Sequence, residues 1–141
     1  MRTWLAAAAV VGIGLSLAGC GLQSNPAAEK AAAGAAEAWL AAVDAGDYGR
    51  SWDDAAAFFR NAMPKDRWEQ TMQSFRSPFG KKLSRTLKSS RYMTSLPGAP
   101  DGQYVVIQFA ASFENKKDAV ETVTPMLDKD GAWRVSGYFI K

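Results

Sequence analysis

The sequence predicts an α+β fold in which three N-terminal helices pack on a curled four-stranded antiparallel sheet, giving a cone-like domain. Two observations lead to this prediction. From residue 26 to about residue 80, apolar residues recur every three or four positions, which is the spacing of a helix with one buried face. From residue 83 onward, apolar residues alternate with others in short segments separated by turn residues, which is typical of an antiparallel meander.

Residues 1–19 predict a lipoprotein signal peptide. Arg2 gives a basic start, and residues 4–17 form an uncharged apolar run of the length expected for a secretory signal. Residues 17–20 read Leu-Ala-Gly-Cys, which resembles the bacterial lipobox and implies cleavage before a lipid-modified Cys20. An uncleaved membrane helix would need about 20 apolar residues, more than this run offers. The uncleaved anchor and cleavage by an ordinary signal peptidase remain as alternatives.

Residues 20–25 are predicted to form the lipidated cysteine and a short tether, and residues 26–141 a single α+β domain. Six extended residues reach only ~20 Å, so the tether would hold the domain close to its membrane. Cys20 is the only cysteine, so the domain must be stable through its core rather than through a disulfide. Acyl chains on Cys20 would anchor it stably. We therefore expect an exported protein, anchored to the outer membrane or to the outer face of the inner membrane, with its domain in the periplasm or at the cell surface.

Each predicted helix has a start signal and an apolar face. Asn25 and Pro26 can begin the first, because Asn caps free N–H groups and Pro fits the first helical position. Gly46 ends this helix and Asp47 can cap the second. A third begins near Pro64 and ends at residues 77–80. The apolar faces are, in turn, Ala32, Ala36, Trp39, Leu40 and Val43; Tyr48, Trp52, Ala55, Ala56 and Phe59; and Trp68, Met72 and Phe75.

The four predicted strands differ in the strength of their patterns. Residues 83–96 are weakly patterned, and residues 97–102 are dense in turn-forming Pro and Gly. Residues 104–113 alternate clearly, with Val105, Ile107, Phe109, Ala111 and Phe113 on one face and the half-polar set Tyr104, Val106, Gln108 and Ala110 on the other. After a turn at residues 115–117, residues 119–126 form the third strand. Asp130 and Gly131 are a hairpin signal before the last strand, residues 132–140.

Several segments are similar to the bacterial domain-of-unknown-function family numbered 4019, from about residue 30 to the C-terminus. They are residues 39–48, 51–52, 96–109, 121–124 and 130–138. The resemblance implies the cone-shaped α+β fold of the nuclear-transport-factor-2-like and cystatin-like superfamily and a secreted or anchored setting. It implies no catalytic residues, because that family has no established activity.

The residue types present exclude several kinds of chemistry. The chain has no histidine, and Cys20 is used for lipid, so nucleophilic triads of the Ser-His-Asp or Cys-His kind are excluded. No Gly-rich phosphate loop is present, and we expect neither a cofactor nor a metal. Residues 128–131 faintly resemble a calcium loop. Met126 and Gly137, however, would stand where acidic ligands belong, so this segment is predicted to be a hairpin turn.

A pocket with a carboxylate base is the alternative function. Asp44, Asp53 or Glu121 could be the base, with Tyr92, Tyr104 or Tyr138 as a hydrogen-bond donor. The candidate pocket residues are Trp39, Trp52, Trp68, Tyr92, Phe109, Glu121 and Trp133. The competing interpretation is that the aromatic residues form plain core and that Glu121 pairs with Arg85 or Arg134. A buried acid at a pocket floor favours the enzyme, and a cone filled by Trp and Phe favours a binding domain.

The positive charge is concentrated in one region. Residues 64–99 hold eight basic and two acidic residues, whereas the whole chain has a net charge of only +3, which implies no nucleic-acid partner. The run Lys81, Lys82, Arg85, Lys88 and Arg91 is either a patch for anionic lipid or envelope polymer, or an edge strand that lysines protect from pairing. In a regular strand Lys81, Arg85 and Arg91 would share one face, and Lys82 and Lys88 the other.

From these observations we expect a membrane-anchored envelope lipoprotein with a non-enzymatic binding or scaffolding domain. Acyl chains on Cys20 provide the contact with the membrane. The half-apolar outer sheet face around Val106 predicts self-association, giving a homodimer through the sheet.

Overall fold

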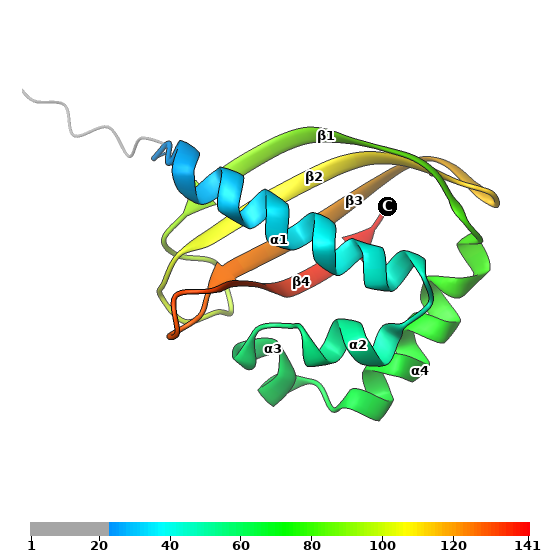
Figure 1. Ribbon diagram of the computed structural model, residues 1–141, viewed down its shortest axis with the longest axis horizontal. Coiled ribbons are helices and arrows are strands. Elements are labelled where there is room, and N and C mark those ends of the chain that lie inside the picture. The colour runs from blue at the N-terminus through cyan, green and yellow to red at the C-terminus, as the bar shows by residue number, and fades with distance from the viewer. Residues whose placement is uncertain (1–22) are drawn as a thin grey trace, which may run out of the picture.

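The computed structural model describes residues 23–141, so the signal peptide and Cys20 lie outside the described residues. The helices lie on one face of an open four-stranded antiparallel sheet with the order β1-β2-β3-β4 (Figure 1). The predicted α+β class and the antiparallel meander are therefore confirmed. Among the described helices, none is long and apolar enough to cross a membrane.

The first helix, α1 (Pro26–Asp44), forms as its sequence signals predict. The Asn25 side chain accepts a hydrogen bond from the Ala28 N–H at 3.1 Å, and Pro26 occupies the first turn. The helix ends before Gly46, whose φ of +75° is a left-handed conformation that suits glycine. The apolar stripe is buried, with Trp39 and Leu40 at its centre.

The prediction of three helices is confirmed only in part. In place of one second helix the chain forms α2 (Tyr48–Asp53) and α3 (Ala57–Ala62), followed by α4 (Lys65–Phe75) and the short 3-10 helix η1 (Ser77–Phe79). The break lies at residues 54–56, where the Ala56 N–H donates to the Val135 carbonyl oxygen at 2.8 Å. Ala55 and Ala56 are fully buried, so the chain leaves the helix to contact the last strand.

The strands are β1 (Lys82–Met93), β2 (Tyr104–Phe113), β3 (Lys116–Leu127) and β4 (Trp133–Ile140). In β2 the predicted apolar face is buried from Val105 to Phe113, as its alternation indicates. The strand predicted for residues 119–126 begins earlier, because the turn after β2 occupies only residues 114–115. The predicted hairpin before β4 is confirmed, with the Gly131 N–H bonded to the Asp128 carbonyl oxygen.

Strand β1 contains two bulges, between Lys82 and Ser84 and between Leu87 and Ser89. A bulge of one residue exchanges the two faces of a strand. Arg85 therefore lies opposite the buried Ala111, whereas Arg91 lies opposite Val106 on the other face. The prediction that Arg85 and Arg91 share a face is wrong for this reason.

The core lies between the helices and the inner sheet face. Its largest buried members come from α1, α4 and the three C-terminal strands, and include Trp39, Leu40, Trp68, Met72, Ile107, Phe109, Val123 and Val135. The gap among Trp39, Trp68 and Tyr138 has no room for a water molecule. The aromatic side chains thus fill the middle of the domain.

Candidate functional site

Glu121 on β3 lies at the centre of a buried polar network. Its side chain is fully buried, and both of its oxygens accept hydrogen bonds. Arg85 donates from Nε to Oε1 at 2.6 Å and from Nη2 to Oε2 at 3.1 Å, and the Tyr138 hydroxyl donates to Oε2 at 2.6 Å. The sequence-based expectation that Glu121 pairs with Arg85 is confirmed.

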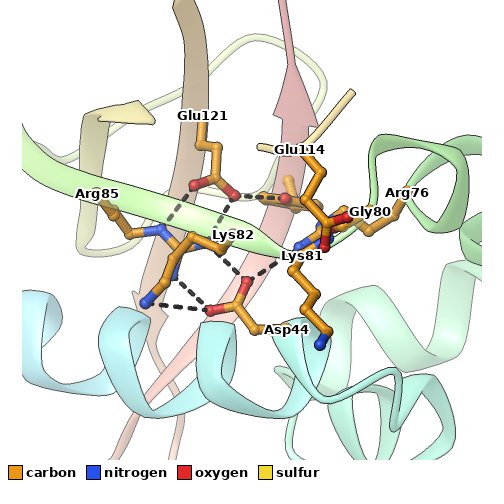
Figure 2. A network of polar contacts seen from close by, with 9 residues as sticks. Asp44, Arg76, Gly80, Lys81, Lys82, Arg85, Glu114 and Glu121 are labelled. Carbon is orange, nitrogen blue, oxygen red and sulfur yellow. Dashed lines mark hydrogen bonds and ion pairs between the residues drawn. The ribbon is translucent and has the colours of Figure 1, made fainter. Parts of the chain in front are cut away.

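Arg85 also binds a second carboxylate, Asp44 in the last turn of α1 (Figure 2). Its Nη1 donates to Oδ2 at 2.6 Å and its Nη2 to Oδ1 at 2.9 Å. Arg76 donates to the same Oδ1 at 3.2 Å, and the Lys82 ammonium lies 3.9 Å from Oδ2. Arg85 therefore links α1 to β1 and β3.

Local structure explains how these side chains meet. Glu121 lies opposite Phe109 and Ile140 on neighbouring strands, which places it on the inner sheet face. The bulge in β1 directs Arg85 to that same face. Arg76 follows α4 and is 3% exposed, with its guanidinium 4.4 Å above the ring of Phe113. We refer to Asp44, Arg76, Arg85, Glu121 and Tyr138 as the buried network.

The pKa values in the buried network favour a fixed pattern of protons. Burial opposes the ionisation of Asp44, but hydrogen bonds and charge from Arg85, with help from Arg76, hold its pKa below the ordinary value. Burial acts to lower the pKa of Arg85, and its bonds to Asp44 and Glu121 raise it overall. Burial and the neighbouring Glu121 charge raise the pKa of Tyr138, so its hydroxyl stays protonated as a donor.

This arrangement binds secondary structure elements together and leaves no group free for proton transfer. A general base needs an unoccupied oxygen within reach of a substrate proton. Both Glu121 oxygens are occupied by Arg85 and Tyr138, and both Asp44 oxygens by Arg85 and Arg76. A buried acid is present, as the enzyme hypothesis requires, but it is fully satisfied.

The predicted pocket residues do not surround one cavity. Trp39, Trp68 and Phe109 are core residues, and the indole N–H groups of Trp39 and Trp68 both donate to Ser51, at 2.7 Å to its carbonyl oxygen and 2.9 Å to its hydroxyl. The remaining predicted aromatic residues are half-buried at separate places. Trp52 donates to the Met63 carbonyl oxygen, Tyr92 to the Gln103 side chain, and Trp133 lines an open cleft.

That cleft, of about 1020 Å³, lies between the α2–α3 region and the β3–β4 hairpin. Its walls carry charges of both signs, including Arg60, Asp101 and Arg134. Arg134 is paired with Asp128 at 3.0 Å and Asp130 at 2.8 Å, and hydrogen bonds from Arg134 lower the pKa of Asp130 to about 2. The sequence analysis did not find this cleft, because one wall exists only through the helix break at residues 54–56.

The predicted basic patch is divided by the fold. The side chain of Arg85 is only 10% exposed and belongs to the buried network. Lys81, Lys88 and Arg91 are exposed, and within residues 23–141 none of them has an ion pair. A groove of about 270 Å³ runs between α1 and β1, with Glu37 and Ala41 on the helix side and Lys82 and Leu87 on the strand side.

Metal chemistry and relatives add two findings. Among the described residues, no group of three or more His, Cys, Asp or Glu side chains has the geometry to hold a metal ion. A family model described as "Protein of unknown function (DUF4019)" matches residues 35–138. No curated protein and no solved structure shows significant similarity to the chain.

Proposed function

Because this chain belongs to the DUF4019 family, whose function is unknown, we propose a function from its own residues. The protein is a lipid-anchored lipoprotein of the cell envelope, and its domain is a non-enzymatic binding or scaffolding module. The observation that carries this proposal is the state of Glu121: the one fully buried carboxylate among the described residues is closed off by Arg85 and Tyr138.

The packing of the core supports a binding role over catalysis. A small-molecule site needs a concave space lined by apolar groups with a few free polar ones. The space between helices and sheet is instead filled by Trp39, Trp68 and Tyr138. The helix layer against one face of an open antiparallel sheet also supports the inference that the domain has the cone-like fold of the nuclear-transport-factor-2-like and cystatin-like superfamily.

The anchoring proposal rests on the Leu-Ala-Gly-Cys segment and on where α1 begins. Asn25 caps α1, so only residues 21–24 separate Cys20 from the folded domain. Five residues spanning Cys20 to Asn25 reach less than ~20 Å even when fully extended. The domain would thus be held beside the membrane surface, in the periplasm or at the cell surface.

Replacing Cys20 by Ser tests the anchor. Without the thiol there is no acceptor for the diacylglyceryl group, so metabolic labelling with a radioactive or clickable fatty acid should disappear. The protein should also move from the detergent phase to the aqueous phase on phase separation, or remain uncleaved. The matched control is Ser24→Cys in the Cys20→Ser background, which restores a thiol outside the lipobox and should restore no labelling. Unchanged detergent partitioning of Cys20→Ser would refute the lipoprotein proposal.

A further inference from the structure

Strand β1 is an edge of the sheet with an unoccupied side. Within the described chain its only strand neighbour is β2. Figure 1 shows it along the margin of the sheet, with no segment beyond it. The backbone N–H and C=O groups that point away from β2 therefore have no strand to pair with among residues 23–141. An edge of this kind can accept an extended segment as a further strand.

Two large apolar side chains distinguish this edge from one that is merely protected. Leu83 is 56% exposed and Leu87 is 51% exposed, the highest values among the exposed large hydrophobic residues. Leu87 also borders the groove in front of α1, together with Ala41 and Phe109. Protection against unwanted pairing requires charges and bulges but gains nothing from exposed leucines.

The charge of this edge selects the partner. No acidic residue occurs in β1, whereas Lys81, Lys88 and Arg91 lie along it, exposed and without ion pairs in the described chain. The acids behind the strand, Asp44 and Glu121, are already bound by arginines. Glu37 on the helix side of the groove is the acidic group that remains exposed there.

We propose that the β1 edge binds a short, extended, acidic segment of a partner protein as a fifth strand. Main-chain hydrogen bonds would supply affinity. Acidic side chains of the segment would meet Lys81, Lys88 and Arg91, and its apolar side chains would cover Leu83 and Leu87. This deepens the binding role proposed above and does not depend on the lipid anchor.

The charges disfavour a second copy of the chain as the occupant. Two β1 strands paired antiparallel would bring lysines and arginines of one copy against those of the other, and like charges directly opposite one another destabilise a sheet. The bulges set the length of the partner. Regular pairing with β2 runs only from Ser84 to Leu87 and from Ser89 to Met93. The segment that fits one of these stretches is therefore only about five residues long, or ~17 Å.

The probe for this proposal is an eight-residue peptide of alternating glutamate and valine carrying a fluorophore. Its binding to the full chain, purified in detergent, is followed by fluorescence anisotropy. Two control peptides have the same sequence with every second backbone amide N-methylated, one on the odd and one on the even positions. Only one set of amides faces β1 in an added strand, so one control should bind at least tenfold more weakly than the parent peptide. Equal binding of all three peptides, or no binding of the parent, would overturn the proposal.

Protein variants localise the site. Leu87→Asp and Lys88→Glu should each weaken parent-peptide binding at least tenfold. Phe139→Asp, at a residue 47% exposed on the opposite edge strand β4, and Lys117→Glu, at an exposed lysine of β3, should leave it unchanged. Leu87→Ser serves in place of Leu87→Asp if thermal melting shows that the aspartate unfolds the domain.

Two further outcomes separate this proposal from its competitors. If phosphatidylglycerol vesicles compete with the peptide equally well against the parent protein and against Leu87→Ser, the patch is an anionic-surface site and the strand proposal fails. If Lys117→Glu weakens binding as much as Lys88→Glu, the attraction is general and the proposal fails as well. Fatty-acid labelling of Cys20 is measured separately, so failure of the anchor and failure of the edge site are distinguishable.

Discussion

At the scale of single residues, Asp44 connects the end of α1 to the sheet through Arg85 and Arg76. Breaking a buried ion pair by removing one partner leaves an uncompensated charge, which costs about 3 kcal/mol or more. Asp53 offers a contrast, because its bond to Lys65 lies at the surface with about half of each side chain exposed. Exposed pairs contribute less than about 1 kcal/mol.

We predict that Asp44→Asn lowers the free energy of unfolding at pH 7 by roughly 3 kcal/mol, whereas Asp53→Asn changes it by less than about 1 kcal/mol. The folded pKa of Asp44 lies below its ordinary value of 3.8. Its contribution is therefore complete well above pH 3.8 and is lost as the pH falls through the folded pKa. Urea unfolding at pH 7, 5, 4 and 3 checks this. Equal costs for the two substitutions, or an unchanged acid dependence in Asp44→Asn, would contradict it.

The sequence allowed only part of the buried network to be predicted. Pairing of Glu121 with Arg85 follows from opposite charges on strands with their faces toward the core. The participation of Asp44 depends on the face that Arg85 occupies, and that face is decided by the bulge between Leu87 and Ser89, which no residue type there signals. Charge runs cannot be assigned to surface or interior until the register is known.

At the scale of elements, the helices show where local signals suffice. Asn25, Pro26 and Gly46 mark both ends of α1, and the structure places the ends there. The break between α2 and α3 has no such marker, because Ala55 and Ala56 are strong helix formers. It results from a tertiary hydrogen bond to Val135, which sequence periodicity does not report. The open cleft beside α3 was missed for the same reason.

The two glycines near α1 make a matched test of backbone conformation. Neither Gly34 within α1 nor Gly46 after it has an atom within 4 Å of an added Cβ, so steric contact plays no part in either substitution. Gly46→Ala should destabilise the domain by about 1 kcal/mol, because alanine is strained at φ +75°. Gly34→Ala should stabilise it by about 0.5–1 kcal/mol through helix propensity. Thermal and urea unfolding give both signs, and a change of the same sign in both variants would contradict the assignment.

At the scale of the whole molecule, the helices cover only one face of the sheet (Figure 1). The opposite face carries small and apolar side chains on adjacent strands, with Val106 and Ala110 on β2 and the exposed Phe139 on β4. An uncovered face of this composition favours association between copies. It is separate from the β1 edge, which bears the positive charge.

We predict that the full chain in detergent forms dimers at high micromolar concentration and that Val106→Lys, which adds a charge to this face, returns it to a monomer. Sedimentation velocity, with the detergent density matched by the solvent, measures the oligomer. Lys117→Glu provides the control, because it changes a charge on β3 outside the apolar area. A parent protein that sediments as a monomer at this concentration would contradict the prediction, as would an unchanged dimer in Val106→Lys.

The contact between α1 and β4 also determines when the domain can fold. The rings of Trp39 and Tyr138 lie 5.1 Å apart, although they come from near opposite ends of the described chain. An isolated amphipathic helix is only marginally stable in water, so α1 depends on a partner that is synthesised last. Closing so long a loop costs chain entropy before any contact is gained, which slows folding. A ribosome-bound chain that lacks β4 would therefore expose the apolar face of α1 until synthesis is complete.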